Sequence, residues 1–197
     1  MEDKLLFTER LKVGRESFQK LQRTSLVRLA DQVSKEACDA LLREVKELAI
    51  PDPNPELRHG PRKIREEVSY QPVEGIVALV AQAYALYFRN VCSEAVLDLN
   101  ECAIWRFPEW SIGIEPHFEF SRIANLQVQI CLKGGITYHL HEPDISCQVR
   151  AGDVLMRAYP GFGEAYRRMH SVSSVRGETI VLSLREHIRE GDSHVHT

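Results

Sequence analysis

Two histidines and one glutamate carry the strongest chemical signal in this 197-residue sequence. His117 and Glu119 are separated by a single residue, and His170 follows much later in the chain. Two imidazoles and one carboxylate can bind one face of a divalent cation such as Fe(II), which leaves three coordination positions open for other molecules. The residue types therefore predict a metal centre with room for chemistry, in which His117, Glu119 and His170 are both the metal ligands and the catalytic residues.

The backbone around His117 decides whether it can act together with Glu119. In a β-strand, residues i and i+2 project to the same face, so an extended segment 114–120 would present both side chains to one cation. Phe118 and Phe120 would then point the other way, into packing. The plainer alternative is a surface histidine and glutamate on an ordinary strand. The metal site thus depends on the elements that surround the motif.

Strands with one polar and one apolar face are predicted after the motif. Residues 125–132 alternate strictly between the two kinds, and the polar face carries three amides, those of Asn125, Gln127 and Gln129. Gly134-Gly135 ends this strand. A last hairpin begins at His170, and its second strand places Arg185 on the polar face.

Taken in order, these motifs resemble the double-stranded β-helix of the non-haem Fe(II)/2-oxoglutarate-dependent dioxygenases. The similarity covers about residues 100–187 and is carried by His117-x-Glu119, Gly134-Gly135, the Ala-Gly-Asp-Val-Leu-Met segment 151–156, His170-x-Val172 and Arg185. The resemblance implies that His117, Glu119 and His170 bind Fe(II), and that Arg185 pairs with the far carboxylate of 2-oxoglutarate. It also implies an oxygenase that uses O₂ for hydroxylation or a related oxidation and releases succinate and CO₂.

The position of the basic residue after the second histidine indicates which subgroup of these dioxygenases the chain resembles. Arg185 lies fifteen residues after His170, which is similar to the taurine dioxygenase and clavaminate synthase branch. Prolyl-hydroxylase-like members place the basic residue nine or ten positions after that histidine, where this chain has Thr179 and Ile180. Arg176, in the turn of the last hairpin, is the competing anchor.

Further residues are predicted to line the site. The amides of Asn125, Gln127 and Gln129 either contact the co-substrate or fill the barrel with hydrogen bonds. Residues at the substrate mouth are predicted to be Arg106, Trp110 and Tyr159, whereas Trp105 suits core packing. The small size of the chain, with no extra domain, favours a small-molecule substrate.

The whole chain is predicted to be one domain of the α+β class, mainly β. Residues 100–187 would form the double-stranded β-helix (jelly-roll) barrel, and residues 1–99 a helical cover packed on one of its sheets. In the cover, Ser34 is a candidate N-cap of a helix. Residues 73–91 suit a packed helix because they carry Glu74, Gln82 and Arg89. The polar stretch 56–70 is predicted to be a loop, either a solvated linker or a mobile lid.

Composition excludes several other classes. The net charge of −3 provides no general attraction to nucleic acid or acidic membranes. The N-terminal residues show no apolar signal region. Five cysteines at irregular spacing suit reduced interior thiols and predict a cytoplasmic protein. We therefore expect a small-molecule substrate and O₂ as partners, with no nucleic acid or membrane partner, while the sequence has no signal for an oligomeric state.

Two other functions compete with the oxygenase. His139-x-His141 could serve a cupin-like metal protein, since the two imidazoles share one strand face. Alternatively, the barrel could be a catalytically silent binding module. The dependence of 2-oxoglutarate affinity on metal distinguishes these classes, because only the oxygenase needs Fe(II) for tight binding of the co-substrate.

Overall fold

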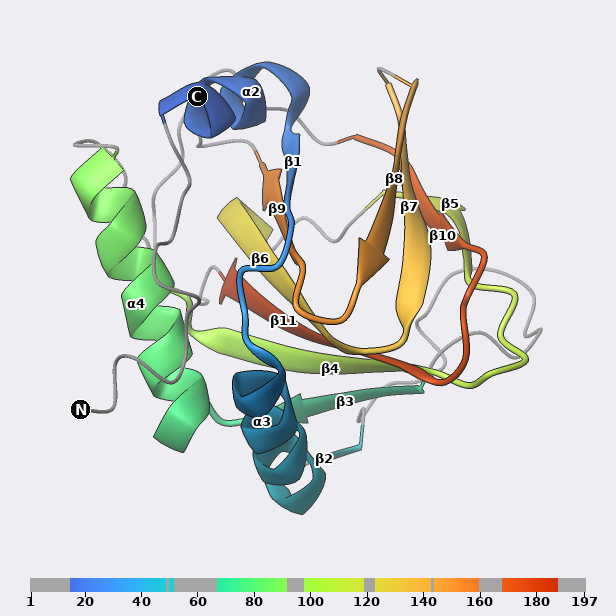
Figure 1. The fold of residues 1–197 in the computed structure, drawn as a ribbon. Helices are drawn as coiled ribbons and strands as arrows, with labels where there is room; N and C mark the ends of the chain where they lie inside the picture. The colour runs from blue at the N-terminus through green and yellow to red at the C-terminus, as the bar shows by residue number, and fades with distance from the viewer. Residues whose placement is uncertain are drawn as a thin grey trace.

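Two antiparallel β-sheets face each other at the centre of the protein (Figure 1). The computed structural model describes residues 15–48, 50–51, 67–91, 98–118, 123–142, 144–159 and 168–187. The large sheet has seven strands in the order β1 (Leu26–Leu29), β9 (Val154–Ala158), β6 (Ile123–Lys133), β11 (Thr179–His187), β4 (Glu101–Phe107), β3 (Glu67–Gln71) and β2 (Ile50–Pro51). The small sheet has four strands in the order β5 (Ile114–His117), β10 (His170–Ser173), β7 (Gly135–His141) and β8 (Asp144–Arg150).

The strands from β4 onward cross between the sheets in the manner of a jelly roll. Consecutive strands lie in alternate sheets, apart from β7 and β8, which form a hairpin within the small sheet. Apart from that hairpin, the strands from β4 onward pair with strands that are distant in the chain. This arrangement confirms the predicted double-stranded β-helix and the predicted α+β, mainly β class.

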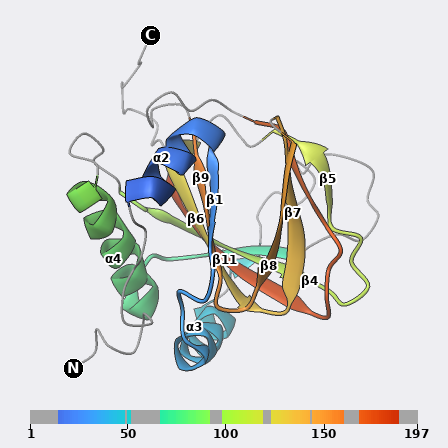
Figure 2. The same ribbon diagram turned by 45° about the horizontal axis from the view of Figure 1, so that its top comes forward.

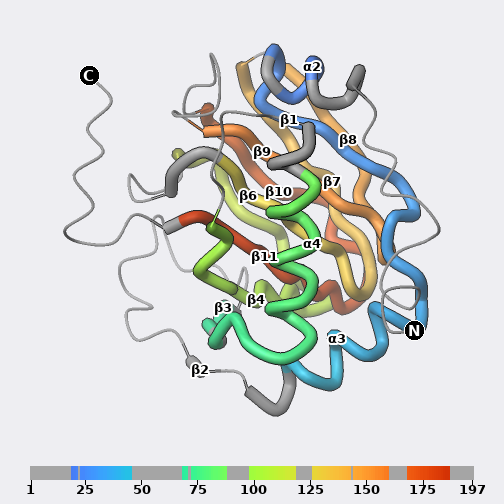
Figure 3. Tube along the Cα trace, turned by 90° about the vertical axis from the view of Figure 1, so that its left-hand side faces the viewer, coloured from blue at the N-terminus to red at the C-terminus, as the bar shows by residue number. Residues whose placement is uncertain are grey.

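Three helices lie on the side of the large sheet that faces away from the small sheet (Figures 2 and 3). They are α2 (Arg15–Thr24), α3 (Lys35–Leu48) and α4 (Gly75–Val91). Apolar side chains of the helices, such as Leu41 and Tyr84, form one core with the outward face of the large sheet. None of the helices in the described part of the chain combines the length and apolar character that crossing a membrane requires.

A second core fills the space between the two sheets. On β11, Ile180, Leu182 and Leu184 pack under the helices, whereas Val181 belongs to the inner core. Since side chains alternate along a strand, Ser183 and Arg185 share the inner face with Val181. This confirms the predicted polar face of the last strand and turns it toward the barrel interior.

The N-terminal half is more than a helical cover. The backbone N–H of Ala37 donates to Ser34 Oγ at 3.2 Å, which confirms the predicted N-cap of α3. However, β1 extends one edge of the large sheet, and β2 and β3 extend the other. The end of the predicted loop 56–70 is a strand, because residues 67–70 pair with β4, and Val68 and Tyr70 pack against the inner core. Residues 56–66 lie outside the described residues.

Gly113 allows the segment before β5 to approach β10. Its φ is +89°, and a Cβ atom there would lie 2.0 Å from the carbonyl oxygen of Val172. We expect Gly113→Ala to lower the free energy of unfolding by roughly 2–3 kcal/mol, since the backbone must move as well as bear the strain. Urea denaturation measures this loss.

Gly177→Ala is the matched control for Gly113→Ala. Gly177 also has a positive φ, +67°, but an added Cβ meets nothing within 4 Å. It should therefore cost only the roughly 1 kcal/mol of a left-handed backbone. Equal losses in the two variants would show that the contact with Val172 contributes nothing.

Candidate active site

A β-bulge directs His117 toward His170. On β10, His170 is paired with His117 and Val172 with Ile114, so three steps along β5 match two along β10. The extra residue changes the side-chain alternation, so that Ile114 and His117 both point inward. Pro116 fits here because β5 is the edge strand of the small sheet and the proline removes no needed donor.

The bulge corrects the expected geometry of the His-x-Glu motif. Within the described part of the segment 114–120, the strand β5 ends at His117. The prediction that Phe118 packs inside is also wrong, because its side chain is 58% exposed. Glu119 and Phe120 lie outside the described residues, so the third predicted ligand stays a prediction. Among the residues that are described, no group of three or more His, Cys, Asp or Glu side chains is placed to hold a metal ion.

The two predicted histidine ligands do meet. Their ring centroids are 4.1 Å apart and their planes are tilted by 52°. His117 Nδ1 lies 2.8 Å from the carbonyl oxygen of Glu115 and donates to it, which leaves Nε2 as the acceptor nitrogen. A backbone carbonyl that orients an imidazole in this way is typical of metal-binding histidines.

His170 is held neutral inside the barrel. It is 3% exposed and stacks on Tyr138 at 5.6 Å between ring centroids. Burial, followed by the positive charge of Arg157 and the nearby His117, holds the pKa of His170 well below its usual range. A neutral imidazole is the form that binds metal. The donor chemistry of His117 and His170 therefore fits a divalent cation.

Arg157, on β9, is the residue at this site that sequence reasoning missed. It is 3% exposed, and its Nη1 and Nη2 lie 3.1 and 3.0 Å from Nε2 and Nδ1 of His170. The guanidinium carbon is 4.9 Å from the ring centroid of Tyr159 and 5.5 Å from that of Tyr138. The available signal was a single charged residue inside the apolar strand Val154–Ala158, because buried arginine is rare without a specific role.

Arg157 belongs to a polar row that crosses the inner face of the large sheet. Strand register places four residues side by side on β4, β11, β6 and β9, namely Glu101, Arg185, Gln127 and Arg157. Further along the same strands, the inner face carries Trp105, Val181 and Cys131. The barrel is thus polar at one end and apolar at the other.

The predicted anchor Arg185 already has an acidic neighbour. It is 4% exposed, forms a salt bridge with Glu101 and lies over the ring of Tyr70 at 5.8 Å. Arg176, the competing anchor, is exposed in the turn at the far end of β10 from His170. Thr179 occupies the position nine residues after His170, where prolyl-hydroxylase-like members have a basic residue. Its hydroxyl forms hydrogen bonds with the backbone of Gly135.

The predicted amides differ in their roles. Gln127 is fully buried: its Nε2 donates to Ser183 Oγ at 2.8 Å, and its Oε1 accepts from Tyr159 Oη at 2.9 Å and from Arg157 Nη1 at 3.1 Å. Asn125 lies on β6, with its side chain outside the described set. The predicted substrate contact Tyr159 is therefore brought to the site through Gln127.

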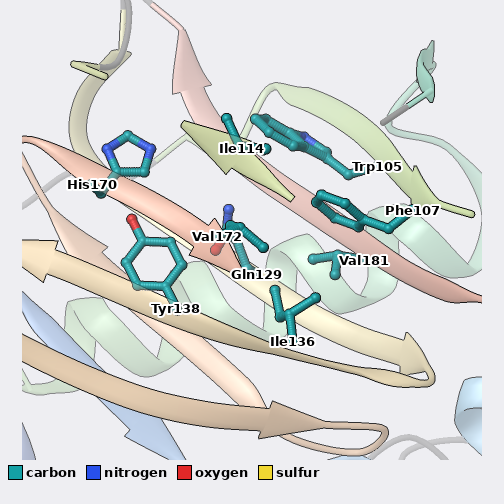
Figure 4. A pocket seen from close by; sticks show the side chains of 9 residues that line it. All are labelled: Trp105, Phe107, Ile114, Gln129, Ile136, Tyr138, His170, Val172 and Val181. Atoms are coloured by element: carbon teal, nitrogen blue, oxygen red, sulfur yellow. The ribbon is translucent and has the colours of Figure 1, made fainter. Parts of the chain in front are cut away.

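A pocket in the inner core adjoins His170 and is lined by Gln129 (Figure 4). The Tyr138 hydroxyl points toward His170, while Trp105 and Phe107 close the apolar side. Trp105 is 9% exposed, as expected for core packing, and no described residue accepts a hydrogen bond from its buried Nε1. An acceptor oxygen entering this pocket would satisfy that donor.

Two predicted substrate contacts lie apart from the histidine pair. Arg106 is exposed on the face of β4 opposite Trp105, and its Nε donates to Glu178 Oε1 at 2.7 Å. Trp110 is 60% exposed in the segment between β4 and β5. The structure therefore brings Tyr159 to His170 but leaves Arg106 at the opposite end of the barrel.

His139 and His141 project from the outer face of the small sheet. His139 has Ser146 Oγ at 2.8 Å from Nδ1 and Ser173 Oγ at 2.6 Å from Nε2, and His141 Nε2 lies 3.0 Å from Ser171 Oγ. Serine partners on the outside of the sheet disfavour the cupin-like metal site.

Solved structures of low sequence identity share the fold of this chain. A prolyl-4-hydroxylase from Pseudomonas putida matches with a TM-score of 0.61 at 13% identity, over 87% of this chain and 97% of that chain. A viral collagen prolyl hydroxylase from Paramecium bursaria Chlorella virus-1, solved as a complex with 2-oxoglutarate, matches with a TM-score of 0.61 at 12% identity, over 84% and 96%. The fold is that of the Fe(II)/2-oxoglutarate oxygenases. An oxidoreductase of this oxygenase family from Burkholderia pseudomallei matches at a TM-score of 0.58 and 13% identity, over 93% and 98%. The sequence itself matches no family model and no curated protein.

Proposed function

We propose that the protein is an Fe(II)- and 2-oxoglutarate-dependent oxygenase that hydroxylates, or oxidises in a related way, a small molecule or side chain. The observation that carries the proposal is the pair of imidazoles, His117 and His170, whose ring centroids lie 4.1 Å apart at the polar end of a barrel of this fold. Glu119, two residues after His117, would complete the ligand set. When bound, the iron would supply activation of O₂, with conversion of 2-oxoglutarate to succinate and CO₂.

The residues of the chain would orient the ligands and exclude water. The Glu115 carbonyl fixes the tautomer of His117, and Tyr138 supports the ring of His170. The apolar pocket wall keeps bulk water from the co-substrate, while Gln129 and the Trp105 N–H supply polar contacts within that wall. This environment suits a reaction that must be protected from side reactions with solvent.

A silent binding module is the second candidate, and the contact of Arg157 with His170 favours it. A guanidinium at 3.1 Å from His170 Nε2 occupies the approach to a metal-binding atom. A barrel in this state could bind an organic acid without any metal. The two functions predict different dependence of 2-oxoglutarate binding on metal.

Metal removal tests the proposed function. We expect Fe(II) with O₂ to give succinate from 2-oxoglutarate, and chelation to raise the dissociation constant of 2-oxoglutarate at least roughly 10-fold, because the metal supplies direct ligand contacts. Calorimetry under anaerobic conditions and a succinate assay measure the two effects. If chelation leaves the dissociation constant of 2-oxoglutarate unchanged and no succinate forms, the silent binding module is favoured.

A further inference from the structure

A buried hydrogen-bond donor lines the pocket that adjoins His170. Trp105 is 9% exposed, and no described residue accepts a hydrogen bond from its buried Nε1. We propose, building on the proposed function, that this pocket binds the uncharged end of a ligand, a carbonyl oxygen of a ketone, ester or amide on a short apolar chain, and that the Trp105 N–H donates to that oxygen. Two sources share this chemistry, the organic substrate and a 2-oxo acid whose far end is uncharged.

The indole N–H restricts what can fill the pocket. It is a donor only, so a purely apolar ligand would leave it unsatisfied. A buried donor without an acceptor is costly, because it has lost its hydrogen bond to water and gained none in return. The neutral Gln129 amide lies among the side chains that line the same pocket (Figure 4). The pocket therefore offers uncharged hydrogen-bonding groups to a ligand oxygen.

The remaining walls of the pocket are apolar. They include Phe107 and Val181 from the large sheet, and Ile136 and Val172 from the small sheet. None of the described residues that line the pocket is Asp, Glu, Lys or Arg. A carboxylate in contact with these walls would lose its hydration without gaining a cation, which costs far more than burial of a hydrogen-bonded carbonyl group. The lining thus favours an uncharged group over an acidic one.

Strand register keeps the charged groups of the barrel away from the indole. Trp105 and Glu101 share the inner face of β4 but are four residues apart, which is roughly 13 Å along a strand. Arg185 lies opposite Glu101 on β11, and Arg157 contacts His170. Figure 4 shows His170 and Trp105 on opposite sides of the pocket. The charges are therefore gathered away from Trp105, and an uncharged ligand end suits its side.

The indole N–H signals in a proton–nitrogen correlation NMR spectrum test the inference. The chain has two tryptophans, and Trp110, which is 60% exposed, provides the internal control. Two ester probes are titrated into protein loaded with Zn²⁺, which undergoes no redox chemistry. Methyl butanoate, added after saturation with 2-oxoglutarate, represents the substrate. The monomethyl ester of 2-oxoglutarate at its far carboxylate represents the 2-oxo acid. The probe that binds should move the Trp105 signal downfield, because a new acceptor deshields the proton, and leave the Trp110 signal in place.

The outcomes distinguish the two sources. A shift with methyl butanoate while 2-oxoglutarate stays bound assigns the pocket to the substrate. A shift with the monomethyl ester that excess 2-oxoglutarate reverses assigns the pocket to the 2-oxo acid. If neither ester moves the Trp105 signal, or if 2-oxoglutarate itself moves it as far as the esters do, the pocket does not select an uncharged group and the inference is overturned.

Trp105→Phe separates the hydrogen bond from packing, because it removes the donor and keeps an aromatic ring. The ester that shifts the signal is compared with its ether analogue, which has a methylene in place of the carbonyl group. In the variant, the preference for the ester over the ether should fall roughly 3- to 10-fold, as expected for loss of one neutral hydrogen bond. Calorimetry measures both affinities. Equal weakening of ester and ether would reflect lost packing and contradict the inference.

The proposed function can fail separately from this inference. If the protein forms no succinate and chelation leaves its affinity for 2-oxoglutarate unchanged, the oxygenase is refuted. A shift of the Trp105 signal by methyl butanoate in the metal-free protein would then still support the pocket as a site for an uncharged carbonyl compound.

Discussion

His170→Ala is expected to abolish metal binding and succinate formation together. The substitution removes the more buried of the two imidazoles and leaves His117 without the ring whose centroid lies 4.1 Å from its own. Loss of groups that merely orient a ligand already costs about 10- to 100-fold in metal affinity, so loss of the ligand should cost at least roughly 100-fold. Mn²⁺ titration and the succinate assay measure both consequences.

The control for His170→Ala is another histidine of the same sheet. His139 lies on β7, directly opposite Ser171 of β10, but faces outward toward Ser146 and Ser173. His139→Ala should leave Mn²⁺ binding and turnover within roughly 3-fold of the unaltered protein, since no ligand is lost. Circular dichroism should show that both variants keep their strands. Turnover that survives His170→Ala would refute the predicted metal centre.

Asp153→Ala is expected to cause a large loss of stability without removing a predicted metal ligand. Asp153 is fully buried in the turn before β9. Its Oδ2 accepts from Arg28 Nε and Nη2 at 2.9 and 2.7 Å and from the Arg150 N–H at 2.9 Å, and its Oδ1 accepts from the Asp31 N–H at 3.0 Å. The Arg28 side chain is 32% exposed and can turn to solvent, but the N–H groups of Arg150 and Asp31 would lose their acceptor, at roughly 1–3 kcal/mol for each unsatisfied group. Urea denaturation should show a loss of that size.

Asp39→Ala is the matched control for Asp153→Ala. Asp39 also pairs with a cation, Lys35 Nζ at 2.9 Å, but both side chains are largely exposed on α3. Exposed pairs of this spacing contribute about 0.3–0.5 kcal/mol. The stability loss of Asp153→Asn should fall between those of the two alanine variants, because asparagine keeps an acceptor oxygen and loses the charge. If the two alanine variants lost the same stability, burial of Asp153 would not be what matters.

Alternation of side chains was sufficient to predict most of the barrel. The strict period of two in residues 125–132 and 179–185 identified β6 and β11, and the same pattern correctly placed Arg185 on the polar face of β11. Local patterns also located the N-cap Ser34. They failed at residues 67–70, which form β3, because the pairing with β4 that satisfies its backbone comes from a distant segment.

The sequence by itself determined the order of the motifs along the chain, the residue types of the predicted metal centre and the fold to which they point. Only the tertiary structure decided which arginine lies beside His170 and which one forms the salt bridge with Glu101. Arg157 and Arg185 look alike in the sequence, yet register within the large sheet pairs Arg185 with Glu101, whereas the small sheet, facing the large one, places His170 beside Arg157. Likewise, a bulge opposite β10 turned His117 inward. Electrostatic and coordination chemistry depend on distances between residues far apart in the chain, and only the pairing of strands sets those distances.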